Sequence, residues 1–349
     1  MEADAHAAGR NRFDAHCTVV FMARILMLGG SGFIGSYMAR RFLNAGHEVT
    51  SVDNFSKYGM LKHDYFDNKR FRHISSDIRT MSPAEYKGYD YVFCLAALIG
   101  GIGYIQRIPY QIAKVNTQIL TSAIDATLAA APDATFVYFS SSMVYQRAQK
   151  EFVEADAYNQ LVPTITYGLQ KLFGEFIVTG ANQEYGMKYV IVRPFNVVGG
   201  GEMPKFDAGN RPDFGNAHVV PDFVYKALTR QSPFEIMGDG KQIRTLTHVE
   251  DFADAMDLLV KKKVKNEDFN ICGDEPVTVA DLAMRTWKKV NMSMPFPGFK
   301  HLKAPNDDVR FRIGKTYKAR KLLGWSPKRG VDDVLDDSIK SMRAYLEPK

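Results

Sequence analysis

The feature that most constrains the fold is a glycine-rich turn near the start of the chain. The sequence LGGSGFIG directly follows an apolar run at 24–29 and opens an amphipathic segment at 33–45. Gly29, Gly32 and Gly35 would permit a tight turn, a close approach of backbone to a phosphate, and close packing of a helix on a sheet. Because the free N–H groups of a helix N-terminus attract anions, this order predicts a phosphate-binding loop.

Apolar runs alternate with helical patterns as far as residue 195. Short apolar strands separated by helices predict a parallel sheet with helices on both faces, and right-handed crossovers make it a doubly wound sheet of the Rossmann type. The expected strands are 24–29, 48–53, 71–77, 90–96, 134–141 and 188–194, and the expected helices are 33–45, 108–131 and 165–185. Ligands of such sheets bind at the carboxyl ends of the strands, so the residues that end each strand are the candidate site.

The pattern changes after residue 195. Residues 199–216 are rich in Gly, Pro, Asn and Asp and predict a long loop. Beyond it we expect helices near 219–230, 249–261 and 277–290, a strand at 268–271 and two short helices at the end. The expected α/β organisation is a polar extension at 1–22, a Rossmann domain at 23–195 that also receives a segment near 235–262, and a smaller mixed α/β substrate lobe, mainly 196–349.

The second expected strand ends in Asp53, where a carboxylate would accept hydrogen bonds from the adenosine ribose of a dinucleotide. A carboxylate there repels a 2′-phosphate, so NAD is favoured over NADP as the cofactor. Asp77 and Ile78 end the third strand and are candidates for contacts with adenine.

A tyrosine, a lysine and a cluster of serines form the candidate catalytic group. Tyr167 and Lys171 lie four residues apart on one face of an expected helix, and a run of three serines at 140–142 ends the fifth strand. A phenol has a free pKa of about 10 and needs a neighbouring cation to act near neutral pH. The pattern predicts that Tyr167 takes a proton from a substrate alcohol while hydride leaves the same carbon, with a serine hydroxyl on the same oxygen.

These motifs resemble those of the extended short-chain dehydrogenase/reductase family, specifically its NAD-dependent nucleotide-sugar epimerases and dehydratases. The resemblance covers about residues 23–345 and rests on GGSGFIG, VDN, SDI, LAA, VN, FSSSMVY, YGLQK, RPFNVVG, GDGKQIRTLTHVED and KLLGWSP. It implies bound NAD and a nucleotide-diphosphate sugar as substrate. It also implies that Ser141, Tyr167 and Lys171 are catalytic and that Asn116 supports the environment of the lysine.

The same resemblance implies the remaining contacts. Asn196 would touch substrate or cofactor, and Arg244 and Arg310 would grip the diphosphate, since a planar guanidinium binds phosphate oxygens in pairs. The cofactor contacts expected are Gly29, Ser31, Gly32, Phe33, Ile34, Gly35, Asp53, Asn54, Asp77, Ile78, Leu95, Ala96, Ala97, Asn116, Tyr167 and Lys171. The substrate contacts expected are Gly101, Ser142, Met143, Asn196, His218, Arg244 and Arg310, and no metal site is expected.

The residues after the catalytic serine separate the possible reactions. In the resemblance, 4,6-dehydratases carry an Asp-Glu pair where this chain has Ser142 and Met143, and GDP-mannose 3,5-epimerases and GDP-fucose synthases carry a cysteine at Met143. AALIGGIGYIQ resembles the Gly-Gly substrate loop of the latter two enzymes, whose second acid/base is a Lys or a His. NAHVVPDF resembles the synthase segment that carries the catalytic histidine, which falls on His218. A thioether has no proton to exchange, which puts proton exchange at two carbons in doubt.

We therefore expect a C4 epimerase, which oxidises the sugar to a 4-keto form with tightly bound NAD and returns the hydride to the other face. The main alternative is a C3/C5 epimerase or epimerase/reductase of a GDP-sugar that uses His218 as acid/base. A 4,6-dehydratase or a decarboxylase comes next. A non-catalytic NAD-sensing protein comes last, because it has no need of Tyr167 and Lys171.

Composition bears on partners and location. The formal net charge of +6 over 349 residues suits anionic small molecules, but no basic stripe with interleaved aromatics predicts a nucleic-acid site. No run of about 18 apolar residues predicts a membrane span. Cys17, Cys94 and Cys272 have no metal-like spacing and fit a reducing, cytoplasmic location. Helices 108–131 and 165–185 carry apolar residues on more than one face and predict a homodimer through a four-helix bundle.

Overall fold

The computed structural model describes residues 21–57, 59–60, 62–147, 151–159, 161–203, 218–304 and 307–347. Most of the expected extension at 1–22, the cysteine at 17 and most of the expected loop at 199–216 lie outside these residues. No helix of the described part is long and apolar enough to cross a membrane.

A seven-stranded sheet with the order β11-β6-β5-β4-β1-β2-β3 forms the larger part of the molecule, and every neighbouring pair in it is parallel. Its strands are β1 (Arg24–Leu28), β2 (Glu48–Asp53), β3 (Phe71–Ser75), β4 (Tyr91–Cys94), β5 (Thr135–Phe139), β6 (Lys188–Pro194) and β11 (Glu267–Ile271). All residues of β4 and β5 are buried, as expected for strands covered on both faces. The predicted doubly wound parallel sheet is confirmed.

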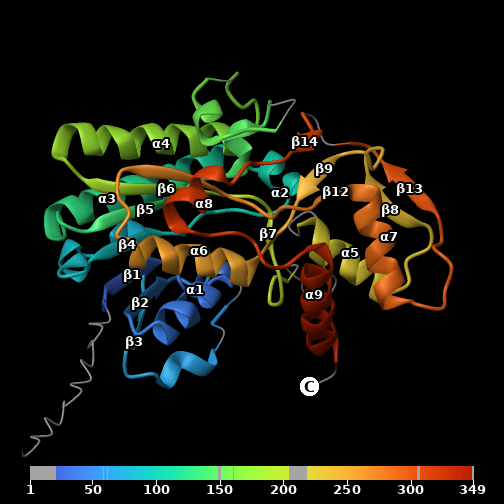
Figure 1. Ribbon diagram of the computed structural model, residues 1–349, viewed down its shortest axis with the longest axis horizontal. Helices are drawn as coiled ribbons and strands as arrows, with labels where there is room; N and C mark the ends of the chain where they lie inside the picture. Colours follow the sequence, from blue (N-terminus) through green and yellow to red (C-terminus); the bar gives the residue numbers. More distant parts are fainter. Residues whose placement is uncertain are drawn as a thin grey trace, which may run out of the picture.

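Helices cover both faces of this sheet (Figure 1). On one face α1 (Phe33–Asn44) packs against α6 (Val249–Lys261), with α8 (Tyr317–Leu323) beside α6. On the other face α3 (Pro109–Ala130) packs against α4 (Thr166–Tyr185), and the short α2 (Ile102–Arg107) precedes α3. A separate buried apolar cluster lies between each face of the sheet and its helices. The helices on both faces therefore carry an apolar stripe that packs on the sheet.

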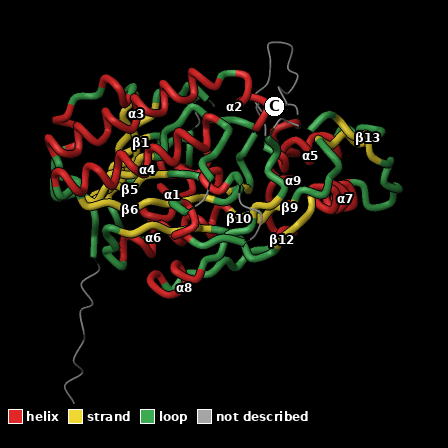
Figure 2. The backbone as a smooth tube through the Cα atoms, turned by 90° about the horizontal axis from the view of Figure 1, so that it is seen from above, coloured by secondary structure: helices red, strands yellow, loops and turns green. Residues whose placement is uncertain are grey.

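A second group of elements gathers at one end of the sheet (Figures 1 and 2). It contains α5 (Val219–Leu228), α7 (Val279–Val290) and α9 (Val331–Leu346), which share one apolar cluster. Its short strands form three small sheets: β7 (Val197–Val198) with β10 (Thr247–His248), β8 (Phe234–Met237) with β13 (Phe299–Leu302), and β9 (Ile243–Thr245) between β12 (Pro276–Thr278) and β14 (Phe311–Arg312).

The edge of the large sheet is built differently from the sequence-based expectation. The strand expected at 268–271 was placed in the second lobe, but β11 pairs with β6 in the register Glu267↔Val190 to Ile271↔Pro194. The chain thus returns to the sheet beyond the segment 235–262, because Phe269 and Ile271 bury their side chains completely in the cluster that α1 and α6 share. This return brings the later elements next to the carboxyl ends of β5 and β6.

Candidate active site

The glycine-rich turn has the geometry that its sequence predicts. Gly29 has φ +86°, and a Cβ there would stand 2.7 Å from the backbone nitrogen of Ala96, so both its conformation and its contacts demand glycine. A Cβ on Gly35 would stand 2.6 Å from the carbonyl oxygen of Gly30, which lets α1 begin directly against the turn. Gly32 is the N-cap of α1 and would meet nothing closer than 3.6 Å, so its surface is open for a ligand.

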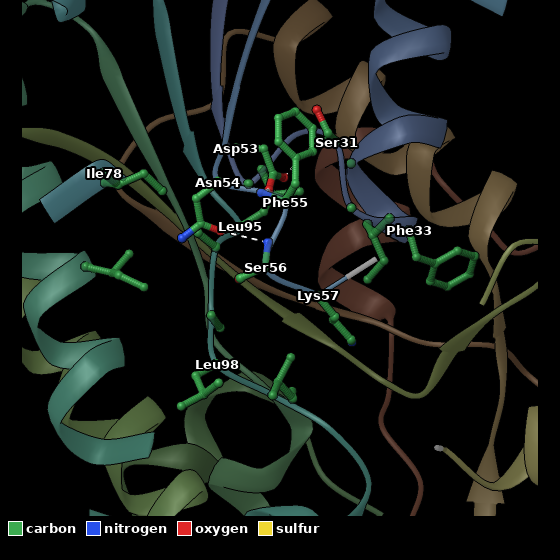
Figure 3. A pocket seen from close by; sticks show the side chains of 18 of the residues that line it. Ser31, Phe33, Asp53, Asn54, Phe55, Ser56, Lys57, Ile78, Leu95 and Leu98 are labelled. Atoms are coloured by element: carbon green, nitrogen blue, oxygen red, sulfur yellow. Dashed lines mark hydrogen bonds between the residues drawn. The ribbon is translucent and has the colours of Figure 1, made fainter. Parts of the chain in front are cut away.

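Asp53 joins the turn to the end of β2. Its carboxylate accepts hydrogen bonds from the backbone nitrogens of Ser31, at 3.1 Å, and Phe55, at 2.9 Å. Figure 3 shows Ser31 next to Asp53, with Leu98 on the other side of the cavity. A carboxylate held in this way keeps a fixed position from which it can accept hydrogen bonds from the hydroxyls of a ribose.

A cavity of about 540 Å³ lies at the carboxyl ends of the first four strands. Thirteen of the residues expected to bind cofactor line it: Gly29, Ser31, Gly32, Phe33, Ile34, Gly35, Asp53, Asn54, Asp77, Ile78, Leu95, Ala96 and Ala97. Asn116, Tyr167 and Lys171 do not line it. The sequence-based analysis missed Phe55, Lys57, Glu202 and Met203, which line it from loops that carry no motif.

These residues fit NAD, the cofactor that the sequence resemblance implies. The open surface at Gly32 and the N-terminus of α1 would take the pyrophosphate, and Asp53 would take the adenosine ribose. Asp77 accepts two bonds from the side chain of Arg79, which lower its pKa and hold it at the edge of the cavity. When bound, NAD supplies the acceptor and the donor of hydride.

The three expected catalytic residues meet at the end of β5. Ser141 is the N-cap of the 3₁₀ turn Ser142–Tyr145, where its Oγ accepts a bond from the nitrogen of Met143 at 3.1 Å. A hydrogen bond between the Ser141 hydroxyl and Tyr167 lowers the pKa of the phenol, and both Tyr167 and Lys171 lie on the buried face of α4. Lys171 donates to the carbonyl oxygen of Phe139 at 2.7 Å, and its Nζ lies 5.9 Å from the centre of the Tyr167 ring.

Burial sets the proton affinities of this pair. It raises the pKa of Tyr167 to about 12, against the hydrogen bond from Ser141 and the charge of Arg312, which both lower it. Burial also lowers the pKa of Lys171 to about 8, although the negative charge of the nearby Glu175 raises it. Below pH 8 the buried lysine therefore keeps its positive charge next to the phenol.

Two features hold α4 against the end of β5. A Cβ on Gly168 would stand 2.7 Å from the carbonyl oxygen of Met143, so only glycine lets the helix come this close beside Tyr167. Two turns further on, Glu175 accepts bonds from Ser140 at 2.5 Å and from both Nε and Nη2 of Arg193, at 2.8 and 2.6 Å. The side chains of Glu175 and Arg193 are both completely buried.

The two asparagines expected at the site, Asn116 and Asn196, form hydrogen bonds with backbone groups of Leu98 and Thr245. Asn116 accepts from the nitrogen of Leu98 at 2.6 Å and donates to its carbonyl oxygen, so its described bonds support the loop after β4. Asn196 has a positive φ of 39° and donates to the carbonyl oxygen of Thr245 at 2.8 Å. Their roles at Lys171 and at a ligand stay predictions.

The two arginines expected at the diphosphate have different surroundings. Arg244 lies on β9, where Asp308 is its ion-pair partner at 3.5 Å and burial lowers its pKa. Arg310 is exposed, and its guanidinium binds both carboxylate oxygens of Asp239 at 2.6 and 2.9 Å. The structure thus gives Arg244 a place in the interior, whereas Arg310 would have to leave Asp239 to reach a ligand.

A third arginine, which the sequence-based analysis missed, lies closest to the catalytic residues. Arg312 on β14 donates to the sulfur of Met143 at 2.7 Å, and its charge lowers the pKa of Tyr167. Met143 is 5% exposed and shares a small apolar cluster with Tyr167. Ser142 beside it is also buried, and Gly101 is the N-cap of α2. No local motif marks Arg312, because only the pairing of β14 with β9 brings it here.

His218 lies on the cavity, at the N-cap of α5. Its Nδ1 is hydrogen-bonded to a carboxylate oxygen of Glu202, which is 7% exposed and whose other oxygen has no hydrogen-bond partner in the part of the chain that the structure describes. Glu202 orients the imidazole of His218, as carboxylates do in acid/base pairs.

Among the described residues, no group of three or more His, Cys, Asp or Glu side chains is placed to hold a metal ion. Both described cysteines are buried free thiols. Burial raises the pKa of Cys94 to about 12 and that of Cys272 to about 11, so neither is a nucleophile at neutral pH.

Comparisons with known proteins agree with this geometry. The chain is 30% identical to GDP-mannose 3,5-epimerase 1 of Oryza sativa subsp. japonica, over 89% of this chain and 79% of that protein. It is 28% identical to a putative UDP-glucose 4-epimerase of Methanocaldococcus jannaschii, over 89% of this chain and 97% of that protein. The crystal structure of UDP-glucose 4-epimerase from Thermotoga maritima with UDP-glucose superposes with a TM-score of 0.74 at 27% identity, covering 93% of this chain and all of that one. The model of the NAD dependent epimerase/dehydratase family matches residues 25–272, and the chain belongs to that family.

Proposed function

We propose that this NAD-dependent nucleotide-sugar epimerase inverts C4 of its substrate. The observation that carries the proposal is the set of groups around Tyr167. Its phenol is hydrogen-bonded with Ser141 and lies near the charged Lys171. Met143 packs in the same apolar cluster as Tyr167, and its thioether cannot exchange a proton. These groups suffice for removal and return of one proton at one hydroxyl.

In this proposal the residues of the chain handle only the proton and the position of the sugar. Ser141 binds the C4 oxygen and passes its proton to Tyr167, whose ionised form Arg312 stabilises by its charge. Lys171, with its Nζ 5.9 Å from the centre of the Tyr167 ring, adds a second positive charge nearby. The 4-keto sugar rotates within the site, and its oxygen then takes the proton back. Nothing in this sequence requires a base at C3 or C5.

The test is incubation of the NAD-loaded protein with UDP-, GDP-, CDP- and dTDP-sugars in D₂O, followed by NMR of the products. A C4 epimerase inverts C4 and incorporates no deuterium at C3 or C5. Deuterium at either carbon would refute the proposal. Tyr167→Phe should abolish turnover while retaining NAD, whereas normal turnover in that variant would remove the catalytic assignment.

A second candidate is epimerisation of a GDP-sugar at C3 or C5, and the pairing of Glu202 with His218 favours it. A buried carboxylate that orients an imidazole on the cavity wall is the arrangement of an acid/base catalyst. The rice relative is named a GDP-mannose 3,5-epimerase. His218→Asn, which keeps a polar group at the N-cap, should abolish deuterium incorporation if this candidate is right. It should leave C4 inversion largely intact if the first candidate is right.

We further propose a cytoplasmic homodimer, with NAD bound mainly by residues 23–195 and the sugar nucleotide mainly by 196–349. Support for the dimer comes from α4, which exposes Leu169, Phe173 and Phe176 along one face at helical spacing. Phe173→Asp should convert the dimer to a monomer in sedimentation velocity. A wild-type protein that sediments as a monomer would contradict the proposal.

A further inference from the structure

Two arginines stand side by side in the second group of elements. β14 pairs with β9 in parallel, and the register places Arg312 opposite Arg244. Among the described residues, only Arg244 of the two has a carboxylate partner: Asp308 pairs with it at 3.5 Å and also accepts from Gln242 Nε2 at 2.7 Å. Arg312 forms no ion pair within the described part of the chain. Within the described residues the pair therefore carries an excess of positive charge, which an anionic ligand would neutralise.

Arg312 has unused hydrogen-bonding capacity as well as unused charge. Its Nε is buried without a hydrogen-bond partner among the described residues, its Nη1 reaches Asn196 Oδ1 at a long 3.4 Å, and its Nη2 contacts the sulfur of Met143. A guanidinium has five N–H donors in a planar fork, and a thioether is a weak acceptor. Leaving charged donors unpaired away from water is costly, so a stronger acceptor should displace Met143 when ligand binds.

The position of Arg312 shows which part of a ligand it faces. It contacts Met143, two residues after Ser141, and its charge acts on Tyr167. It does not line the cavity of the cofactor. Since Ser141 and Tyr167 serve the reacting hydroxyl, the fork of Arg312 faces the substituents next to that hydroxyl, and Arg244 remains for the diphosphate.

We propose that Arg312 binds a carboxylate carried by the sugar beside its reacting carbon, so that the substrates of this site are nucleotide hexuronates. The inference rests on the proposed function for the place of the reacting hydroxyl. A carboxylate matches the fork with two parallel hydrogen bonds and supplies the missing negative charge. The hydroxymethyl group of a neutral hexose can do neither.

Binding to Tyr167→Phe protein loaded with NAD tests the inference without turnover. Calorimetry would compare UDP-glucuronate with UDP-glucose, and GDP-mannuronate with GDP-mannose. In at least one nucleotide series the hexuronate should bind about 100-fold more tightly, the range of a charge-assisted hydrogen-bonded pair. Equal binding of the two sugars in both series, or no binding of either hexuronate, would overturn the inference.

Variants locate the preference at Arg312. In the same background, Arg312→Gln should weaken hexuronate binding about 100-fold and change hexose binding less than about threefold. Arg312→Lys should lose part of the preference, because lysine keeps the positive charge but lacks the planar guanidinium. Arg285→Gln on α7, a partner of Glu275, is the matched control and should keep the preference. If Arg312→Gln weakens UDP or GDP alone as much as the hexuronate, Arg312 serves the diphosphate and the inference fails.

Failure of the C4 assignment would look different. Deuterium at C3 or C5 of the product would refute C4 inversion and leave the binding preference in place. A lost preference with clean C4 inversion would refute the role of Arg312 alone. Circular dichroism of each variant shows whether the fold is retained, and the wild-type preference can be measured without any variant at Arg312.

Discussion

Replacing Glu175 by glutamine should lower the free energy of unfolding and move the alkaline limit of activity to lower pH. Glu175 lies on α4, one turn after Lys171, and its carboxylate accepts two bonds from Arg193 and one from Ser140. Glutamine preserves the volume and one oxygen. It removes the negative charge and turns an NH₂ group toward the Nη2 donor of Arg193, which lies 2.6 Å from the present oxygen.

The magnitude follows from what Arg193 keeps. Removing one partner of a buried ion pair costs about 3–5 kcal/mol, because the other charge is left uncompensated. Arg193 retains an ion pair with Asp268 at 2.9 Å, so we expect the lower end of that range, about 3 kcal/mol. This corresponds to a loss of about 100-fold in the folding equilibrium. Glu85→Gln is the control, since its pair with Arg72 is exposed and should contribute at most about 1 kcal/mol.

Urea unfolding followed by far-UV circular dichroism measures the change in free energy of unfolding. A second readout comes from Lys171: burial lowers its pKa to about 8, and the charge of Glu175 opposes this and keeps the pKa from falling further. Without that charge the pKa falls, and the lysine loses its proton at lower pH. The alkaline fall in kcat/KM should therefore move downward in Glu175→Gln and stay in place in Glu85→Gln. A free energy within 1 kcal/mol of wild type, or an alkaline limb that moves upward, would refute this reasoning.

Other substitutions test neighbouring parts of the site. Gly168→Ala should lower kcat about 100-fold with the fold retained, because the added methyl group displaces Tyr167 from its contact with Ser141. Gly180→Ala on the same helix is the control: its methyl group meets nothing within 4 Å, so it should keep wild-type kcat and raise stability by up to about 1 kcal/mol. Asp53→Ala should weaken retention of NAD by about 10- to 100-fold in equilibrium dialysis, and an unchanged NAD content would rule out its ribose contact. Lys171→Arg keeps its charge above pH 8, so any residual activity should lose the alkaline limb; a limb at unchanged pH would assign it to another group.

Much of the fold follows from local pattern. Apolar runs predicted β1, β4, β5 and β6 within a few residues, because a strand buried on both faces has no polar alternation. The glycine-rich turn and Asp53 were predicted as a unit, since their spacing is set by one strand, one turn and one helix. Tyr167 and Lys171 were predicted to share a helix face for a similar reason, and both lie on the buried face of α4. The pattern offered three serines at the strand end, and only the family resemblance singled out Ser141.

The sequence alone thus determined the sheet, the cofactor and the pair on α4, which depend on short-range spacing. The tertiary structure alone decided which distant residues complete the site. It brought β11 back to the sheet edge, paired Glu202 with His218, turned Arg310 to Asp239, and set Arg312 on the sulfur of Met143, 169 residues away in the chain. Such contacts depend on the register of short strands and on how the second group packs, and periodicity along the chain carries no information about either. Met143 at the end of β5 could be named from the sequence, but the arginine that contacts it could not.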